Sequence, residues 1–552
     1  MKTLKILFTV TILLVLTANL LAVVEVKKWE PFEIRFVAKN IYENPYVQGM
    51  PDKAEALLKV IFSGTSGAAA GMSLTMEGFW DGNWDTRNTF RIRFSPPATG
   101  VWKYESISGD PQMNGVKGEI TCTDWTDQEK AENPTRRGHI QVCNDGSRAG
   151  RYFEYSDGTP FFWIADIWSY WTKKGIHFSS FQEVVKDRVN KGFTVGMMRF
   201  SSNRRGVPLD QTCDIMDVNE MKRIDGMVAY ANSRGMTIWL LHWWGGKYVM
   251  ELSAEKMRRF NRYLVARLGA YNVVWVVAGE YNLDNYGGMG IDFWKNYGAY
   301  VKSIDPYQKR VLSIHHTPPG WSGGKEAPQW STGEFLHNEK WMDFNQFQVG
   351  HDDWRQEKIP EIAKFEYSLN PPKPFLCTEP WIEFLKQETP ADMVRFGGWS
   401  SILSGGAGHT YGAGGIWIAH VPEAPANVFS YDFDWYHKAL DYPGGNGIGI
   451  MSRFFQGMKW WKLEPNQKLI DENKDNFCSA LPGKEYVIYL RHGGSVKVNL
   501  APSSAKDKFN YRWFNPGTGT YQGSETISGG GTKTFSAPDN FDWVLHINID
   551  NK

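Results

Sequence analysis

Two glutamates stand where paired carboxylate chemistry can occur. Glu280 directly follows the apolar run Trp275-Val-Val-Ala-Gly, and Glu379 directly follows Pro374-Phe-Leu-Cys-Thr. Two carboxyl groups on opposite sides of a glycosidic bond, about 5 to 5.5 Å apart, can hydrolyse it with retention of configuration. The two residues are distant in the sequence, so this chemistry needs a fold that brings the ends of two strands together.

The middle of the chain predicts such a fold, because apolar strand-like runs alternate there with polar loops and amphipathic helix-like stretches. Helix-like stretches with apolar residues at three- and four-residue spacing lie at residues 181–191, 218–234, 254–269 and 293–304. Near-continuous apolar runs are typical of buried parallel strands. We expect eight strands, at residues 161–167, 194–200, 237–243, 273–279, 310–315, 341–346, 374–378 and 408–416. This pattern predicts a (β/α)8 TIM barrel.

In such a barrel the active site lies at the carboxyl ends of the strands, where Glu280 ends the fourth strand and Glu379 the seventh. This placement resembles clan A of the retaining glycoside hydrolases, in which the acid/base follows strand four and the nucleophile follows strand seven. The resemblance implies that Glu280 protonates the leaving oxygen and later activates water, while Glu379 forms the glycosyl-enzyme intermediate. We expect burial and charge proximity to raise the pKa of Glu280 and to leave Glu379 ionised.

Three motifs make the resemblance more specific. They are Gly158-Thr-Pro-Phe-Phe-Trp-Ile-Ala-Asp166, Lys191-Gly-Phe-Thr194 and Trp399-Ser-Ser-Ile-Leu-Ser-Gly-Gly-Ala-Gly-His409-Thr-Tyr411-Gly. Together they resemble the apiosidase-like barrel group over most of residues 158–417. Many clan members carry Asn just before the acid/base, where it holds the sugar 2-hydroxyl, but this position is Gly279 here. Asn282 or His242 would then have to make that contact.

Other polar and aromatic residues at the predicted strand ends are candidate substrate contacts. The clan resemblance implies that Arg199 is a cation beside the nucleophile and that Trp417 forms the floor under the sugar. The alternatives are a buried structural ion pair for Arg199 and core packing for Trp417. The expected substrate-binding residues are Asp166, Trp168, Arg199, His242, Trp243, Asn282, His315, Asn345, His409, Tyr411 and Trp417.

The histidines and cysteines do not predict a metal site. His242, His315, His316 and His409 form no HExxH-like element, and no two of them share a helical face. The five cysteines form no CxxC or Cys/His cluster, and Cys122 with Cys143 is the candidate disulfide pair. We therefore expect neither a metal nor a cofactor.

Strand-rich segments flank the predicted barrel domain, residues 135–465. Residues 26–125 contain short alternating runs broken by turn residues, as in a β-sandwich, and resemble the immunoglobulin-like domain that often precedes bacterial glycosidase barrels. Residues 470–552 again contain short strands with Gly-rich turns, and resemble a C-terminal module labelled as collagen-binding. We thus expect a multidomain chain with a central barrel between an N-terminal β-sandwich and a small C-terminal β-sandwich.

Composition indicates the class of ligand, and the N-terminal segment indicates the cellular compartment. Among 552 residues, 61 Lys and Arg balance 60 Asp and Glu, so no global field attracts nucleic acid, and the 15% aromatic content suits saccharide binding. Residues 1–22, with a charged start and an apolar run, are expected to be a cleaved signal peptide that exports the protein to the periplasm or the outside. An uncleaved membrane anchor is the alternative, because the apolar run is near spanning length.

These features predict an O-glycoside hydrolase that cleaves a poly- or oligosaccharide by a retaining double displacement. Two alternatives stay open: a carbohydrate-binding protein without catalysis, and a polysaccharide lyase with a His or Tyr base and an Arg that neutralises a uronate. No GxGxxG or GxxxxGK[ST] motif follows a first strand, which disfavours Rossmann dehydrogenases and P-loop enzymes. The sequence identifies neither the sugar nor the oligomeric state.

Overall fold

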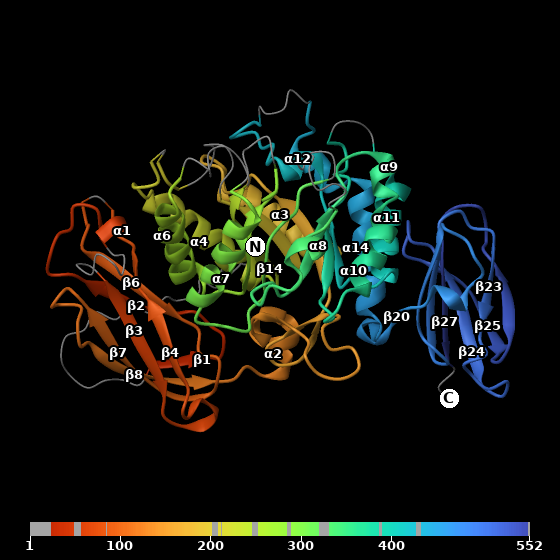
Figure 1. Ribbon diagram of the computed structural model, residues 1–552, viewed down its shortest axis with the longest axis horizontal. Helices are drawn as coiled ribbons and strands as arrows, with labels where there is room; N and C mark the ends of the chain where they lie inside the picture. The colour runs from red at the N-terminus through yellow and green to blue at the C-terminus, as the bar shows by residue number, and fades with distance from the viewer. Residues whose placement is uncertain are drawn as a thin grey trace, which may run out of the picture.

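The chain forms three parts in a row. The computed structural model describes residues 24–48, 57–83, 85–200, 208–210, 212–244, 252–283, 289–318, 330–385, 389–426 and 432–549, so the expected signal peptide lies outside the described residues. Figure 1 shows an N-terminal strand domain, a central barrel wrapped by helices and a C-terminal strand domain. The prediction of a multidomain chain with a central TIM barrel is confirmed.

The N-terminal domain packs two sheets against each other. The larger sheet orders β1 (Val24–Lys27), β8 (Lys117–Thr123), β7 (Gly100–Ser108), β3 (Leu58–Gly64) and β4 (Ser73–Glu77), and the smaller orders β2 (Phe32–Val37), β6 (Thr89–Phe94) and β5 (Phe79–Trp80). In β3, Leu58, Val60 and Phe62 are buried while the residues between them are partly exposed, as expected for a strand with one buried face. Phe62 stacks on Phe94 of the smaller sheet, with ring centroids 4.0 Å apart.

Eight parallel strands form the barrel in chain order. They are β12 (Trp163–Trp168), β13 (Val195–Arg199), β14 (Thr237–Trp244), β15 (Val273–Gly279), β16 (Leu312–Ser313), β17 (Asn345–Gln348), β18 (Phe375–Glu379) and β19 (Gly408–Tyr411). The first strand, β12, pairs with both β13 and β19. At the remaining junction, between β16 and β17, the Asp343 N–H donates to the Leu312 carbonyl at 2.9 Å. The barrel is therefore nearly closed.

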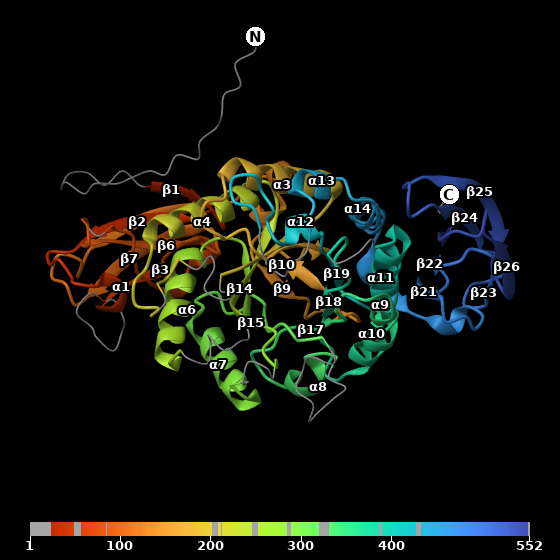
Figure 2. The same ribbon diagram turned by 90° about the horizontal axis from the view of Figure 1, so that it is seen from above.

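Helices cover the outside of the barrel (Figure 2). The long ones are α3 (Phe178–Lys191), α4 (Val218–Ser233), α6 (Ala254–Leu268), α7 (Ile291–Ile304), α10 (Ile359–Ser368), α11 (Ala391–Leu403) and α14 (Pro443–Gln456). Shorter helices are α1 (Pro45–Gln48), α2 (Asp127–Glu132), α8 (Gly333–Leu336), α9 (Asp353–Gln356), α12 (Gly414–Trp417) and α13 (Tyr436–Leu440). Every residue of β12, β13, β15, β17, β18 and β19 is buried, which explains the nearly continuous apolar sequences of strands such as β12 and β15.

The amino end of the barrel is plugged. A small sheet of β9 (Ile140–Val142), β10 (Phe153–Tyr155) and β11 (Pro160–Phe161) lies there. Phe153 of this sheet contacts Trp163 at the start of β12 and Phe344 just before β17. The opposite end, where the strands terminate, is therefore the place for a site.

The sixth strand lies later in the chain than the sequence predicts. The expected strand is residues 341–346, whereas β17 covers Asn345–Gln348. The indole of Trp341 packs on helix α7, so closely that a Cβ on Gly298 would come within 2.3 Å of it. The apolar run thus begins in the loop before the strand, and Asn345 stands at the start of the strand instead of its end.

The eighth strand is shorter than the predicted 408–416. It ends at Tyr411, and the chain then turns into helix α12. The turn needs small residues, because a Cβ on Gly414 would lie 2.5 Å from the Phe384 carbonyl oxygen. The apolar residues Ile416 and Trp417 therefore belong to a helix above the barrel mouth.

The C-terminal domain has a six-stranded and a two-stranded sheet. The first orders β20 (Glu464–Pro465), β21 (Asn476–Leu481), β22 (Glu485–Leu490), β27 (Trp543–Ile549), β24 (Lys508–Phe514) and β25 (Tyr521–Ser528), and the second pairs β23 (Ser495–Asn499) with β26 (Thr532–Ser536). Helix α11 contacts this domain, and Trp399 and Arg395 make two of the contacts. Trp399 stacks on Tyr489 with ring centroids 5.9 Å apart, and Arg395 forms two hydrogen bonds of 2.7 Å with Asp542.

A buried ionic cluster joins the N-terminal domain to the barrel. Asp225 of α4 lies 2.9 Å from Arg93 of β6 and 2.6 Å from Arg267 of α6. Arg267 also contacts Asp81, which follows β5, at 2.8 Å. Burial would raise the pKa of Asp225, but the charges of Arg267 and Arg93 outweigh it and hold this pKa below the usual range. Each domain therefore supplies charges that the other needs.

The described cysteines are all reduced and buried, so the candidate pair Cys122 and Cys143 does not form a disulfide. Cys122 lies in β8 of the sandwich, and Cys143 follows β9 beneath the barrel. Within the described ranges, no helix has the length and apolar character needed to cross a bilayer.

Replacing Asp225 with alanine should destabilise the protein by about 3–5 kcal/mol, because Arg93 and Arg267 would remain buried without the carboxylate that they share. Urea unfolding followed by tryptophan fluorescence measures this change. The matched control is Asp441→Ala, at an exposed site, for which we expect a change within about 0.5 kcal/mol. Equal unfolding midpoints for the two variants would contradict the role of the cluster.

Candidate active site

The two glutamates lie at the open end of the barrel. Glu280 directly follows β15, and Glu379 is the last residue of β18. Figure 2 looks down on this end, with β14, β15, β17, β18 and β19 near its centre. Glu379 is 5% exposed, and its charge is one of the causes that shift the pKa of Glu280. The carboxyl groups therefore share one electrostatic environment.

Glu379 interacts with two imidazoles. Nε2 of His315 lies 3.2 Å from Oε2, and Nε2 of His351 lies 3.1 Å from Oε1. Burial would raise the pKa of Glu379, but the hydrogen bonds and charges of His315 and His351 outweigh it and hold this pKa far below the usual range. Glu379 is thus a carboxylate at neutral pH.

Each imidazole has a second partner that orients it. The Ile382 N–H donates to Nδ1 of His351 at 3.5 Å, which leaves Nε2 as the nitrogen that donates to Glu379. Nδ1 of His315 lies 2.9 Å from the hydroxyl of Thr378, the residue before Glu379 in β18. These contacts fix the direction from which the carboxylate receives its hydrogen bonds.

Glu280 accepts hydrogen bonds from two neutral donors instead. Nε1 of Trp244 lies 3.0 Å from Oε2, and Nε2 of Gln348 lies 3.1 Å from Oε1. Burial and the negative charge of Glu379 raise the pKa of Glu280. The site therefore separates the pKa values of the two carboxyl groups: Glu379 is ionised, and Glu280 keeps its proton to a higher pH.

The backbone at Glu280 is strained, and its neighbour has no room for a side chain. Glu280 has a φ of 45°, which costs a residue other than glycine about 1–3 kcal/mol and clusters at functional sites. A Cβ on Gly279 would lie 2.2 Å from Cε3 of Trp244. The indole thus fills the space where clan members carry Asn, which gives the departure noted in the sequence a steric reason.

Arg199 lies between two aromatic rings at the same mouth. Its guanidinium carbon is 4.2 Å from the ring centroid of Tyr170 and 4.3 Å from that of Trp244. Its Nε is buried and finds no partner among the described residues. The charge of Arg199 lowers the pKa of Glu280, and no ion pair among the described residues joins it to Glu379. Arg199 is therefore near the acid/base candidate and keeps an unused donor at its Nε.

Trp417 completes this aromatic wall. It is 8% exposed, and its ring centroid lies 5.6 Å from that of Tyr170 in an edge-on arrangement. Because Tyr170 follows β12 and Trp417 lies in α12, the segments after the first and last strands both contribute to the wall.

Four of the expected substrate contacts face helices behind the first and third strands. Asp166 accepts hydrogen bonds from Nε of Arg188 in α3 at 2.6 Å and from Nε1 of Trp168 at 2.9 Å. His242 and Trp243 both bind the side-chain amide of Asn261 in α6, each at 2.9 Å. Burial lowers the pKa of His242 to about 3, so it is neutral. These four side chains stabilise strand–helix packing.

Two more expected contacts are also engaged away from the glutamates. Asn345 stands at the start of β17, far from the strand's carboxyl end, and its amide donates to Glu366 of α10 at 2.6 Å. The Tyr411 hydroxyl donates to Glu383 at 2.5 Å. Adjacent residues of a strand point to opposite faces. A residue one position away from a mouth-facing residue therefore faces the helices instead.

The other expected residues lie close to the site or in the barrel wall. Asn282 contacts Nε2 of His316 at 3.1 Å and accepts from the Thr317 N–H at 3.0 Å, so it holds the segment that follows His315. His409 is 1% exposed in β19, and burial lowers its pKa to about 3. The structure thus brings Arg199, His315 and Trp417 to the mouth, with Asn282 beside them.

Four residues of the site were not among the expected contacts: Tyr170, Trp244, Gln348 and His351. Gln348 and His351 were missed because the sixth strand was expected to end two residues early. Trp244 is the last residue of β14, directly after the expected end of that strand. A search for polar or aromatic residues up to three positions beyond each expected strand end finds Tyr170, Trp244 and Gln348, whereas His351 lies five positions beyond the expected end of the sixth strand.

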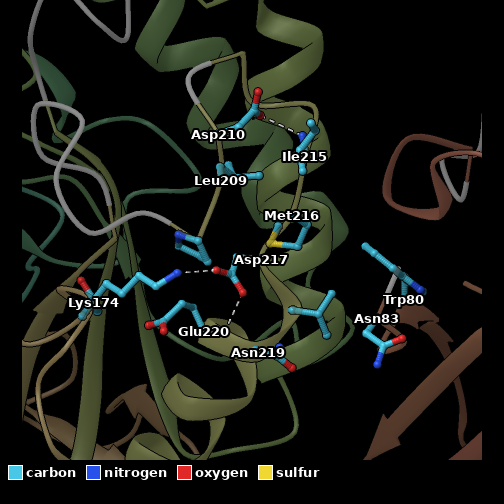
Figure 3. A pocket seen from close by; sticks show the side chains of 13 residues that line it. Trp80, Asn83, Lys174, Leu209, Asp210, Ile215, Met216, Asp217, Asn219 and Glu220 are labelled. Carbon is cyan, nitrogen blue, oxygen red and sulfur yellow. Dashed lines mark hydrogen bonds and ion pairs between the residues drawn. The ribbon is translucent and has the colours of Figure 1, made fainter. Parts of the chain in front are cut away.

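A separate pocket of about 490 Å³ opens where the N-terminal domain meets the barrel (Figure 3). Trp80 and Asn83 of the sandwich line one side, and Lys174 and Asp217 of the barrel form an ion pair of 3.2 Å on the other. Thr172, also in its wall, donates to the Arg199 carbonyl at 2.7 Å. The sandwich therefore shapes a hollow near the barrel mouth.

Comparison with protein families gives three matches along the chain. Residues 147–462 match the family described as apiosidase-like, catalytic domain. Residues 25–109 match a domain of unknown function, DUF5060, and residues 465–548 match a family provisionally named as the collagen-binding domain of a collagenase. No functionally curated protein matches the sequence.

Two solved structures from Bacteroides vulgatus share this fold. A glycoside hydrolase family 5 protein is 19% identical, with a TM-score of 0.66, and the match covers 75% of this chain and 95% of that one. A second protein, provisionally classed as a glycoside hydrolase, is 17% identical, with a TM-score of 0.72 and coverage of 96% and 100%. The family match extends over more than half of the chain. The protein described here therefore belongs to the apiosidase-like family.

Proposed function

We propose that this protein is an O-glycoside hydrolase that cleaves a poly- or oligosaccharide with retention of configuration. The observation that carries the proposal is the different environment of the two carboxyl groups. Glu379 is bound by His315 and His351 and is ionised, while Glu280 is bound by neutral donors and has a raised pKa. A nucleophile must be ionised and a general acid must hold a proton, so each environment suits one role.

In the first step, a carboxylate oxygen of Glu379 attacks the anomeric carbon. The bond to the leaving oxygen breaks, and the Glu280 proton moves to that oxygen, so a glycosyl ester on Glu379 and a free alcohol result. In the second step, the Glu280 carboxylate takes a proton from water, and the hydroxide oxygen bonds to the anomeric carbon. The ester bond breaks and returns Glu379 as a carboxylate, and the second inversion restores the original configuration.

The aromatic wall and Arg199 suit a sugar in this mouth. Tyr170, Trp244 and Trp417 are aromatic, and ring faces that Arg199 does not cover can pack on the apolar faces of sugar rings. Arg199 has donor capacity that no described side chain uses at its Nε. We propose that it donates to a ring substituent, and that Asn282 acts indirectly by holding the loop of His315 and His316.

The proposal predicts that Glu379→Ala and Glu280→Ala each lower kcat/KM at least about a thousandfold, which is about 4 kcal/mol of barrier. The purified wild type and both variants are assayed on a panel of polysaccharides and aryl glycosides, with product anomers followed by NMR. The Glu366→Gln variant is the control, because Glu366 is a buried carboxyl bound to Asn345 behind β17.

A product with inverted configuration would overturn the double displacement, and active glutamate variants would overturn the site. A product that absorbs ultraviolet light at a new double bond would instead indicate a lyase. Binding of a saccharide without any turnover would support the carbohydrate-binding alternative.

The activity should have a bell-shaped pH dependence. Activity falls at low pH as Glu379 gains a proton, and it falls at high pH as Glu280 loses one. In His351→Ala, Glu379 loses one hydrogen bond, so its pKa rises and the acid limb of kcat/KM should move to higher pH. The His351→Gln variant keeps an N–H donor, and its acid limb should lie between those of wild type and His351→Ala. An unchanged acid limb in both variants would contradict this role.

The two glutamates should also affect stability with opposite signs. Glu280 has a raised folded pKa, so stability falls as pH rises from about 4.5 through that pKa, and Glu280→Gln should raise Tm at pH 7. Glu379 has a lowered folded pKa, so its stabilisation is present above about 4.5 and is lost as pH falls through the folded value, and Glu379→Gln should lower Tm at pH 7. Shifts of about 2 °C or more are expected in calorimetry. Shifts of the same sign would contradict the assigned protonation states.

A further inference from the structure

A second cavity lies between the barrel and the C-terminal domain and has a volume of about 800 Å³. Its walls come from the second half of α14, the loop that follows it, and strands β22, β24, β25 and β27. Trp460 in that loop contacts Phe162, just before β12, with ring centroids 4.7 Å apart. The cavity is thus near the amino ends of the barrel strands, opposite the glutamates. We call it the junction groove; residues used below are Arg453, Lys459, Trp461, Glu485, Arg512 and Tyr521.

The junction groove carries more positive than negative charge. Three cations line it, Arg453, Lys459 and Arg512, against one carboxylate, Glu485. Glu485 is already bound to Nε2 of His546 at 3.1 Å. Among the ion pairs of the described residues, that of Glu485 is with His546, and none involves Lys459 or Arg512. A concave surface lined by one sign of charge attracts ligands of the opposite sign.

An aromatic side chain lies beside these cations. Tyr521 is 40% exposed, and the guanidinium carbon of Arg512 lies 4.0 Å from its ring centroid. Trp461 lines the same groove. A guanidinium group binds carboxylate or sulfate through paired hydrogen bonds, while a ring face packs on the apolar face of a sugar. The two together match a sugar that carries an acidic group.

The groove is preformed, because the junction between the domains is firmly packed. Phe454 of α14 contacts Phe514 of β24 with ring centroids 4.7 Å apart, and Phe514 contacts Tyr521 at 5.0 Å. The bidentate pair of Arg395 and Asp542 holds the same two domains together. Binding would therefore require little reordering of the protein, which favours affinity.

We propose that the junction groove is a second carbohydrate site, which binds a sugar chain bearing carboxylate or sulfate groups. Arg512 and Lys459 bind the acidic groups, and Tyr521 packs on a ring. The site is remote from Glu280 and Glu379, so it can hold one stretch of a polymer while the barrel mouth is free for another. This binding does not depend on the roles proposed for the two glutamates.

Affinity electrophoresis of the full chain tests the proposal. Native gels contain polygalacturonate, a sulfated carrageenan or neutral galactomannan, and the first two distinguish a carboxylate from a sulfate ligand. The variant is Lys459→Ala with Arg512→Ala, and the matched control is Lys468→Ala with Lys506→Ala, which removes two charges at exposed sites outside the groove. We expect at least one acidic polymer to retard wild type and control, with about tenfold weaker binding by the groove variant.

Tyr521→Ala separates stacking from charge, and we expect it to weaken binding of the same polymer while both cations remain. Thermal unfolding of each variant shows that a loss of binding is not a loss of fold. Three results would overturn the proposal: no retardation of wild type by either acidic polymer, equal retardation of the groove variant and its control, or equal retardation of wild type by galactomannan. Retardation by duplex DNA as strong as by the acidic glycans would also overturn it, because it would indicate general polyanion binding.

Discussion

Two carboxyl groups buried in one barrel mouth cannot both be ionised without a large cost, and the rest of the site depends on this constraint. The chain meets it by giving imidazole hydrogen-bond partners to one group only. His315 and His351 bind Glu379, while Trp244 and Gln348 offer neutral donors to Glu280. The proton therefore resides preferentially on Glu280. This distribution follows from four neighbours that come from β14, β17 and the segments after β16 and β17.

The barrel makes this arrangement possible because it brings strand ends from distant parts of the chain to one place. Its strands carry the two glutamates at their carboxyl ends, while the small sheet of β9, β10 and β11 fills the other end. The flanking domains add walls outside the strands. The sandwich closes a hollow near Thr172, and the C-terminal domain closes the junction groove against α14. A pocket therefore lies at each of the two junctions between the barrel and a flanking domain.

The sequence predicted the barrel and the place of its two glutamates well, because continuous apolar runs followed by a single Glu are a strong local signal. It predicted poorly which of the other side chains at the strand ends point to the barrel mouth. Asp166, Trp168, His242 and Trp243 bind partners in helices, and a sequence without contacts does not tell which of two adjacent residues points to the mouth. The sixth strand was misplaced because Trp341 packs on α7 before the strand begins. Because of that shift His351 was not among the expected site residues, and its contact with Glu379 depends on the folded chain.

The cluster of Asp225, Arg93, Arg267 and Asp81 has an evolutionary consequence. A gene fusion or deletion that separated the sandwich from the barrel would expose α6 and leave Arg267 and Asp225 without two of their partners. On the opposite flank, loss of the C-terminal domain would uncover Trp399 and Arg395 of α11. A mutation on one side of either boundary would therefore need a matching change on the other side.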